Sequence, residues 1–477
     1  MNNQQLSLDL IEAQYNLKNS IKNKNSKSLL IIIGGIELTK KNQSIKKLSE
    51  LMDPRYLKIK AEIPNQIQPN KIIWQPYINN IPKNGQIMVF YSNWYTDLLA
   101  STILEDGKIS KNEFKKHLED IYSFEDYLKN NNVDVIKVWF DVSWQKVKQR
   151  TQKIDFSKFI QRVPYLVWDD VPSSKWKTKT LYNQIQMLRQ RFTQDWIMID
   201  SENNSERNLQ FSQLVLKHLK QAPIEPKKTS TYQPAPILPA LTQIQKSEIS
   251  QAEYKKISNQ LERKVADALR YSSHNVVLVF EGMDAAGKGS SIKRIIKFLG
   301  LHEYNIHSIS APENFERLRP YLWRFWNKHS NNGALNIFDR SWYGRVLVER
   351  VEDLICPAQW QNAYAEINQY EKQLSDTNTI VIKFWLAISK EEQLHRFNQR
   401  KNTPQKSFKL TEEDWRNREK WDAYLQAASD MFKYTSTDLA PWHIIANDRK
   451  YAARIEILQI ILKNVQAKNL EHLKILE

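Results

Sequence analysis

Three glycines between Gly282 and Gly289 mark the stretch of this chain whose residue types best suit phosphate chemistry. They are three of only ten glycines in 477 residues. In GMDAAGKG, four residues separate Gly282 from Gly287 and Lys288, which is the spacing of a P-loop up to its lysine. In such a loop, glycines let backbone N–H groups turn onto phosphate oxygens, and the following helix N-terminus adds partial positive charge. The pattern therefore predicts a phosphate cradle rather than an ordinary glycine turn.

An acidic residue at the end of a second apolar run predicts a metal site beside this cradle. Asp339 closes the run ALNIFD, 51 positions after Lys288. A carboxylate at the carboxyl end of a neighbouring strand is typical of a Walker B acid that holds Mg²⁺. The alternative is a helix-capping aspartate.

The predicted cradle lacks the usual hydroxyl ligand for Mg²⁺, because Gly289 stands where most P-loops have serine or threonine. Ser290 could shift into that role. Asp284, inside the loop, offers an oxygen ligand of the kind Mg²⁺ prefers. We therefore expect Asp284 and Asp339 to be the pair of metal-binding acids, the alternative for Asp284 being a turn-forming role.

Arginines follow the predicted acid closely. Arg340 is adjacent to it, Arg345 comes five residues later, and Arg396 and Arg400 lie four apart on one predicted helix face. Phosphoryl transfer depends on positioning and on neutralising charge spread over equatorial oxygens, which guanidinium groups match. A solvated surface role is the alternative for each arginine, and it is weakest for Arg340.

Lysine and arginine continue along the segment that follows the loop, at Lys293, Arg294 and Lys297. Such charge suits a long polyanion better than a single nucleotide, although a solvated basic helix face explains each residue singly. The phosphate-binding set that we predict is Gly282, Ala286, Gly287, Lys288, Gly289, Ser290, Lys293, Arg294 and Arg345.

Apolar runs alternate with longer amphipathic stretches along the chain, which predicts an α/β fold with parallel sheets flanked by helices. An internal repeat is also visible: residues 29–48 overlay residues 276–295 at a displacement of 247 positions, and 89–99 overlay 337–347 at 248. Between the copies, residues 221–246 are rich in proline and predict a stiff, extended linker. We expect a first copy at 1–220 and a second, catalytic copy at 247–477.

The first copy retains the apolar residues of the repeat but not its polar ones. Lys40 and Asn42 replace the glycines of the cradle, and Tyr91 replaces the strand-end acid. Side chains at glycine positions would stand where phosphate must approach the backbone. We interpret the first copy as catalytically inert, with scaffolding, dimer contact or polyanion docking as its candidate roles.

Composition bounds the protein's class. The formal net charge of +17 indicates a polyanionic partner, and the single cysteine, Cys356, excludes a disulfide framework and is expected to be buried. The first residues lack a signal-peptide pattern and no long apolar run occurs, so we expect a soluble cytoplasmic protein without a membrane partner. Without a recognisable nucleic-acid-binding motif, we expect no nucleic-acid partner.

Five motifs together resemble the family-2 polyphosphate kinases over residues 247–465. They are GMDAAGKG, FDRSWYGRVLVERVE, KFWLAISKEEQLHRF, LTEEDWRNREKWDAY and APWHIIANDRKYAARI. The duplication resembles the two-domain subclass, the polyphosphate:AMP phosphotransferases. The resemblance implies tandem P-loop kinase-like domains, a helical lid at about 401–424, Mg²⁺ as cofactor, and phosphoryl transfer from inorganic polyphosphate to AMP, giving ADP. It implies as catalytic residues Asp284, Lys288, Asp339, Arg340 and Arg400, the last with Arg396 as competitor.

Two alternatives stay open from the sequence. The same fold could act on ADP or GDP, or the chain could be a non-catalytic polyanion- or nucleotide-binding protein. The intact acidic and basic residues of the second copy favour an enzyme. The sequence leaves undecided the oligomeric state, with a homo-oligomer as a possibility, the preferred polyphosphate length and the role of the first copy.

Overall fold

The structure is a computed structural model that describes residues 3–22, 26–62, 67, 71–104, 109–152, 178–192, 195–223, 232–245, 247–328, 335–408 and 410–476. Contacts divide the chain into two compact units. The N-terminal unit comprises Met1–Pro226 and Glu313–Trp323, and the C-terminal unit comprises Lys227–Pro312 and Arg324–Glu477.

The N-terminal unit is built on a five-stranded sheet in the order β2-β3-β1-β4-β5, with parallel pairing throughout. The strands are β1 (Ser28–Gly34), β2 (Leu57–Lys60), β3 (Ile87–Phe90), β4 (Val133–Asp141) and β5 (Trp196–Asp200). The central strand β1 is buried on both faces of the sheet. Its sequence is therefore an unbroken apolar run and not an alternation of apolar and polar residues.

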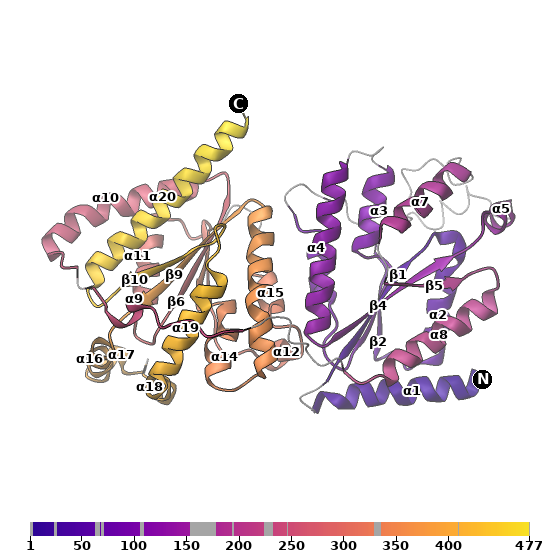
Figure 1. The fold of residues 1–477 in the computed structure, drawn as a ribbon, viewed down its shortest axis with the longest axis horizontal. Helices are drawn as coiled ribbons and strands as arrows, with labels where there is room; N and C mark the ends of the chain where they lie inside the picture. Colours follow the sequence, from indigo (N-terminus) through magenta and orange to yellow (C-terminus); the bar gives the residue numbers. More distant parts are fainter. Residues whose placement is uncertain are drawn as a thin grey trace. The chain divides into compact units, whose positions relative to one another are not determined.

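Helices cover both faces of this sheet (Figure 1). One face carries α1 (Asn3–Asn19), α2 (Lys41–Leu51) and α8 (Asn204–Lys220), whose apolar stripes share a core with the strands. The other carries α3 (Trp94–Leu104), α4 (Lys111–Asn130) and α7 (Lys179–Arg191). The helix α5 (Trp144–Gln152) follows β4, and short 3₁₀ turns are η1 (Ser20–Lys22), η2 (Glu37–Thr39) and η3 (Gln75–Asn80).

The C-terminal unit repeats this sheet in the order β10-β9-β6-β8-β7, again parallel. The strands are β6 (Asn275–Gly282), β7 (Tyr304–Ser308), β8 (Leu335–Asp339), β9 (Thr379–Ala387) and β10 (Trp442–Ala446). The two sheets have the same strand order: β6, β7, β8, β9 and β10 occupy the places of β1, β2, β3, β4 and β5. The predicted α/β duplication is therefore confirmed.

The helices of the C-terminal unit also form two layers (Figure 1). One layer holds α10 (Gln251–Arg270), α11 (Lys288–Ile295) and α20 (Lys450–Leu476), and the other holds α14 (Val348–Val351), α15 (Pro357–Asp376) and α19 (Trp421–Thr435). The remaining helices are α9 (Pro239–Thr242), α12 (Asn314–Arg317), α13 (Trp323–Trp326), α16 (Lys390–Lys401), α17 (Pro404–Ser407) and α18 (Glu412–Glu419), with η5 (Ile296–Phe298) and η6 (Trp342–Arg345) as 3₁₀ turns. None of the described helices combines the length and apolarity needed to span a membrane.

One short segment belongs to the N-terminal unit although the chain places it between β7 and β8. Within Glu313–Trp323, Leu318 O accepts a hydrogen bond from Asn84 N at 2.7 Å, and Leu322 N donates to the Tyr127 hydroxyl at 2.8 Å. Trp323 Nε1 also donates to a backbone carbonyl, Ile78 O, at 3.0 Å. The sequence repeat gives no sign of this exchange.

The proline-rich stretch is not a free spacer where the structure describes it. Tyr232 donates its hydroxyl hydrogen to Asp430 Oδ2 at 2.6 Å, and Ala235 N donates to Asp430 Oδ1 at 2.6 Å. Gln426 Nε2 on the same helix, α19, donates to Ala235 O at 2.8 Å. Residues 224–231 and 246 of the predicted linker lie outside the described residues.

The expectation that Cys356 is buried is wrong, because its thiol is exposed. Cys356 is the N-cap of α15, directly before Pro357. A proline in the first turn fixes a helix start, and this start lies at the surface.

The predicted lid range holds α17, α18 and the first residues of α19. Thr411 and Asp414 form a capping box at the start of α18, since each side chain satisfies the other's backbone N–H. Lys409, within the predicted lid, lies outside the described residues.

Candidate active site

The loop from Gly282 to Gly287 connects β6 to α11 at the carboxyl edge of the second sheet. Gly282 (φ 140°) and Gly287 (φ 100°) both adopt left-handed backbone conformations that favour glycine. A β-carbon on Gly282 would lie 2.5 Å from Leu386 O of the neighbouring strand β9. The backbone conformation therefore favours glycine at both positions, in addition to the room that a glycine leaves for phosphate.

The backbone carbonyls of this loop are held from outside by side chains. Gln393 Nε2 donates to Asp284 O at 3.0 Å, and Arg396 Nη1 donates to Ala285 O at 2.9 Å. The next carbonyl, Ala286 O, accepts from the amide of Asn447, which follows β10. Three consecutive carbonyls thus have protein partners.

The N–H groups at the start of α11 remain available. Those of Gly287, Lys288 and Gly289 have no acceptor among the residues that the structure describes. Unpaired N–H groups at a helix N-terminus form an anion-binding site, helped by the helix dipole. The arrangement can therefore bind a phosphate group.

Lys288 points back into the loop. Its Nζ donates to Gly282 O at 2.8 Å and to Met283 O at 3.3 Å. Burial, and then the neighbouring Arg340, lowers the pKa of Lys288 below its ordinary value. The ammonium thus lies among backbone carbonyls, where a bound phosphate would offer it stronger acceptors.

Asp284 and Arg340 form an ion pair at the mouth of the loop. Arg340 Nη2 lies 2.8 Å from Asp284 Oδ1, and the second oxygen, Oδ2, accepts from Asn417 Nδ2 at 2.7 Å. Arg340 has a left-handed backbone (φ 63°), uncommon for an arginine, and its N–H donates to Phe280 O at 3.0 Å. Burial opposes the charge on Arg340, yet Asp284 raises its pKa above the ordinary value.

Asp339 ends β8 beside the loop. Its carboxylate has no hydrogen-bond or ion-pair partner within the described part of the chain. A β-carbon on Gly289 would find only Asp339 Oδ2 within 4 Å, at 3.9 Å, so the space beside the carboxylate is open. An unpartnered carboxylate facing open space fits a hydrated Mg²⁺, which keeps several of its waters. Asp284 fits the same ion less freely, because both of its oxygens already accept hydrogen bonds.

A buried acid lies beneath this site that sequence reasoning did not select. Glu281 accepts a hydrogen bond from the Ser341 hydroxyl at 2.8 Å. Burial raises the pKa of Glu281, although the nearby Lys288 partly offsets the shift.

The predicted arginines separate into different roles. Arg396 donates to the backbone of the loop at Ala285 O and forms an ion pair through Nε with Glu392 Oε1 at 2.7 Å. Arg345 pairs with Glu349 at 2.6 Å. The guanidinium of Arg400, one helical turn beyond Arg396, has no ion pair or hydrogen bond with the described residues, although the Arg400 carbonyl accepts from Thr403 N at 3.1 Å.

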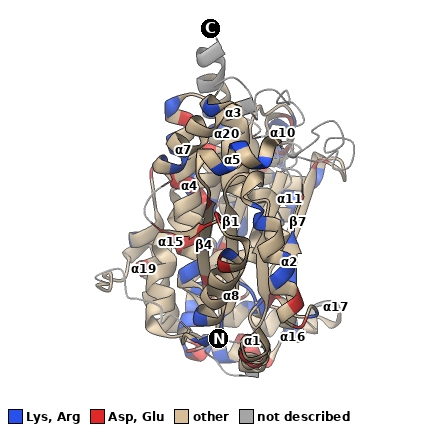
Figure 2. Ribbon diagram, turned by 90° about the vertical axis from the view of Figure 1, so that its right-hand side faces the viewer, with Lys and Arg blue, Asp and Glu red and all other residues tan. Residues whose placement is uncertain are grey.

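The basic residues of α11 and the turn after it are only partly available. Lys297 pairs with the buried Glu262 at 2.6 Å, so its charge is already compensated. Lys293 is exposed and Arg294 half-buried. Figure 2 draws the lysines and arginines of α11 and of its counterpart α2 in blue.

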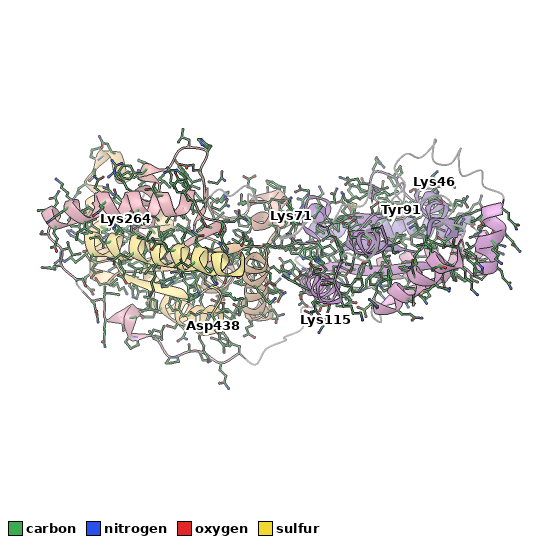
Figure 3. All side chains as sticks on the ribbon, turned by 90° about the horizontal axis from the view of Figure 1, so that it is seen from above. Lys46, Lys71, Tyr91, Lys115, Lys264 and Asp438 are labelled. Carbon is green, nitrogen blue, oxygen red and sulfur yellow. The ribbon has the colours of Figure 1, made fainter. Side chains whose placement is uncertain are left out.

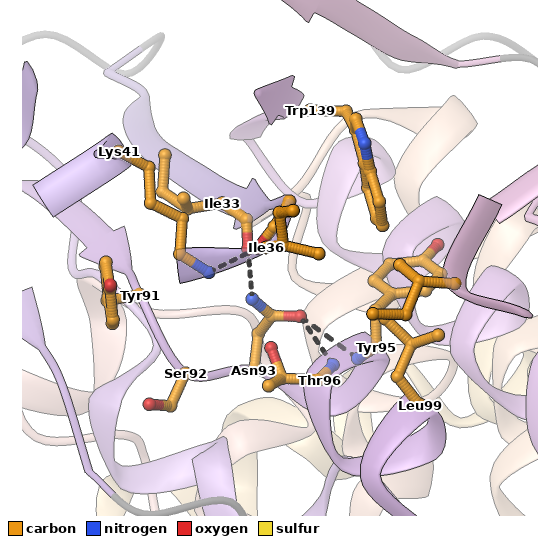
Figure 4. Close-up of a pocket in the computed structure, with 13 residues that line it drawn as sticks. Ile33, Ile36, Lys41, Tyr91, Ser92, Asn93, Tyr95, Thr96, Leu99 and Trp139 are labelled. Atoms are coloured by element: carbon orange, nitrogen blue, oxygen red, sulfur yellow. Dashed lines mark hydrogen bonds between the residues drawn. The ribbon is translucent and has the colours of Figure 1, made fainter. Parts of the chain in front are cut away.

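The same place in the N-terminal unit is built differently. Lys41 Nζ donates to Gly35 O at 2.6 Å, as Lys288 does to Gly282 O, but it also lies 4.8 Å over the ring of Tyr91 (Figure 4). Tyr91 is also labelled among all the side chains in Figure 3. Lys40 holds the left-handed N-cap conformation (φ 60°) that Gly287 holds in the other copy. The cavity at this place is about 30 Å³, which is room for a few water molecules.

Sequence reasoning missed Gln393, Asn417 and Asn447 as parts of the site. Gln393 and Arg396 are three apart on α16 and share a face, which is a usable signal. The two asparagines carry no such signal, because each reaches the loop from a distant element.

The chain is similar to known proteins along nearly its whole length. The family model described as polyphosphate kinase 2 matches residues 2–227 and 244–473. A polyphosphate:AMP phosphotransferase of Acinetobacter johnsonii is 49% identical over 98% of this chain and 97% of its own length. One from Pseudomonas aeruginosa is 35% identical over 96% of this chain and 94% of its own.

Solved structures and shorter relatives complete the comparison. A crystal structure of a putative polyphosphate kinase 2 from Pseudomonas aeruginosa superposes with a TM-score of 0.81 at 33% identity, covering 97% of this chain and 94% of that one. A GDP-polyphosphate phosphotransferase of Pseudomonas aeruginosa, 35% identical, covers only 45% of this chain and 60% of its own length. The resemblance seen in the sequence is thus confirmed across both copies, and the chain belongs to the polyphosphate kinase 2 family.

Proposed function

We propose that this chain transfers the terminal phosphoryl group of inorganic polyphosphate to AMP, giving ADP, at the cradle of its C-terminal unit. One observation carries the proposal: the carbonyls of residues 284–286 have side-chain partners, the N–H groups at the start of α11 are open, and Lys288, Asp339 and the pair of Asp284 with Arg340 lie at the same loop. This arrangement can position and neutralise a phosphoryl group, which is most of what phosphoryl transfer requires.

The whole-chain relatives support AMP as the acceptor. The relatives named polyphosphate:AMP phosphotransferases align with nearly all of this chain, whereas the GDP-polyphosphate phosphotransferases align with less than half. AMP also suits the site chemically. Its phosphate is already largely dianionic at neutral pH, so the acceptor needs orientation more than proton removal.

Each residue has a proposed role within this reaction. Lys288 and the N–H groups of Gly287 and Gly289 bind the transferred phosphoryl group, and Arg340 neutralises charge that develops on it. Arg400, whose guanidinium has no partner among the described residues, neutralises charge from the lid side. Lys293 and Arg294 bind more distant phosphates of the polymer.

Asp339, with Asp284, would hold Mg²⁺ in this proposal. The ion would supply positive charge that neutralises the phosphate groups there. The chain's own acids then orient the donor and acceptor phosphates, and their role does not include taking a proton. The reaction is proposed to take place in the cytoplasm.

An acceptor panel tests the proposal. The purified full-length chain is offered polyphosphate with AMP, ADP or GDP, and the products are separated by ion-exchange chromatography. We expect ADP formation from AMP to exceed product formation from ADP or GDP by at least about tenfold in kcat/KM, since these acceptors need a differently shaped site. No ADP from AMP would overturn the proposal, and a preference for ADP or GDP would assign the chain to the nucleoside diphosphate kinases.

A further inference from the structure

The side-chain amide of Asn417 joins the lid helix α18 to the phosphate-binding loop. Its Nδ2 donates to Asp284 Oδ2 at 2.7 Å, and its Oδ1 accepts from the Tyr424 hydroxyl at 3.3 Å. These two contacts define the orientation of the amide, because a flipped amide would set its oxygen against the Asp284 carboxylate. Asn417 is therefore placed as a donor to the acid of the loop.

The next residue along α18 reaches the other end of Asp284. Arg418 Nη1 donates to Gln393 Oε1 at 3.1 Å and to Lys390 O at 2.6 Å. Gln393 in turn donates to the backbone carbonyl of Asp284 at 3.0 Å. Asn417 thus contacts the Asp284 carboxylate directly, and Arg418 contacts the Asp284 carbonyl through Gln393.

Two ion pairs near the end of α18 are weaker than the contact with Asp284. Arg416 and Lys420 pair with Glu352 at 3.3 and 3.1 Å, and both cations are more than a third exposed. Exposed ion pairs contribute little, whereas a hydrogen bond to a mostly buried carboxylate contributes more. The Asp284 side chain is 12% exposed. The hydrogen bond to Asp284, together with the contacts of Arg418, therefore holds α18 on the site.

We propose that Asn417 is a latch that links the position of the lid to cation binding. In the ligand-free chain its amide holds α18 on Asp284, and a divalent cation that binds Asp284 competes with that amide for Oδ2. By linkage, the cation weakens the latch by the same factor by which the latch weakens the cation. The inference rests on the proposed function in taking Asp284 as a cation ligand. Asn417 acts through Asp284 and is a positioning residue.

Two measurements on the full-length protein test the latch without any phosphate substrate. Hydrogen exchange reports the protection of Glu412–Glu419, and the loss of free Mn²⁺ signal in electron paramagnetic resonance reports binding of Mn²⁺ alone. In Asn417→Ala we expect exchange in α18 to rise and the Mn²⁺ dissociation constant to fall, each by about tenfold, which corresponds to one hydrogen bond to a charged group. Glu419→Gln, an exposed change two residues away on the same helix, should leave both at wild-type values.

An isosteric variant separates the latch from simple loss of packing. Asn417→Asp keeps the size of the side chain but sets a second carboxylate against Asp284, so α18 should be released as in Asn417→Ala. Unchanged protection of α18 in either variant, or Mn²⁺ binding by Asn417→Ala that is unchanged, absent or weaker, would overturn the proposal. Neither readout involves AMP or polyphosphate, so failure of the latch is distinguishable from failure of the proposed reaction.

Discussion

Asp339→Asn is expected to lower the rate of ADP formation by about a thousandfold while leaving the fold intact. The reason is that Asp339 ends β8 at the open side of the loop and has no partner among the described residues whose loss would disturb packing. Asparagine keeps the size of the side chain and removes its charge. Polyphosphate binding, which depends on the backbone N–H groups and basic residues, should persist.

The measurement is kcat for ADP formation, with polyphosphate binding followed separately by calorimetry. Asp200→Asn is the matched control, because Asp200 also ends a strand, β5, at the corresponding edge of the N-terminal sheet. It should retain wild-type activity. Turnover by Asp339→Asn within tenfold of wild type would remove Asp339 from the proposed metal site.

Lys383→Met is expected to lower the free energy of unfolding by about 3–5 kcal/mol. The Lys383 ammonium is fully buried and donates to Glu371 Oε2 at 2.7 Å, to the Tyr343 hydroxyl at 2.8 Å and to Thr435 O at 2.7 Å. Removing it leaves the Glu371 carboxylate buried without its counter-charge. Burial lowers the pKa of Lys383, although the neighbouring Glu371 partly offsets this shift.

The hydrogen bonds of Lys383 and Glu371 also position the turn after Arg340. The N-terminal unit contains an equivalent buried ion pair, which provides a control variant. Glu371 Oε1 accepts from Trp342 Nε1 at 3.0 Å and from Tyr343 at 2.7 Å, in the turn that follows Arg340. The N-terminal unit repeats the pattern with Lys137, Glu125 and Trp94. Tyr95 occupies the place of Tyr343 there and accepts from Lys137 at 3.3 Å.

Urea unfolding followed by tryptophan fluorescence, with activity measured below the transition, distinguishes the two copies. Lys383→Met and Lys137→Met should both lower the unfolding midpoint, but only Lys383→Met should also lower turnover. If Lys383→Met unfolds at the wild-type urea concentration, the buried ion pair does not stabilise the fold.

Much of the fold could be predicted from the sequence, because the determinants are local. The strand β1 and its counterpart β6 are unbroken apolar runs, and the glycines at Gly282 and Gly287 are required by left-handed backbone. Side chains that end such strands necessarily meet at one edge of a parallel sheet. Asp339 could therefore be expected at the same edge as Lys288 from its place at the end of an apolar run.

The contacts that hold the loop could not be predicted in the same way. Gln393, Asn417 and Asn447 reach it from α16, α18 and the end of β10, more than a hundred residues along the chain. Their roles depend on side-chain geometry that no periodicity encodes. The sequence leaves the choice between Arg396 and Arg400 open for the same reason. Spacing puts both on one face, and they differ in the structure because the Arg396 guanidinium is held by Glu392, Ala285 O and Asn447 O.

The duplication makes one measurement decisive for the claim that only the second cradle is catalytic. Lys41 and Lys288 occupy equivalent positions, and each donates to the carbonyl of a glycine that ends a strand or follows it. In the full-length chain, ADP formation from AMP and polyphosphate is measured for Lys41→Met and Lys288→Met. We predict that Lys288→Met loses at least about a hundredfold in kcat while Lys41→Met keeps wild-type turnover. Wild-type turnover by Lys288→Met, or an equal loss in both folded variants, would contradict the account.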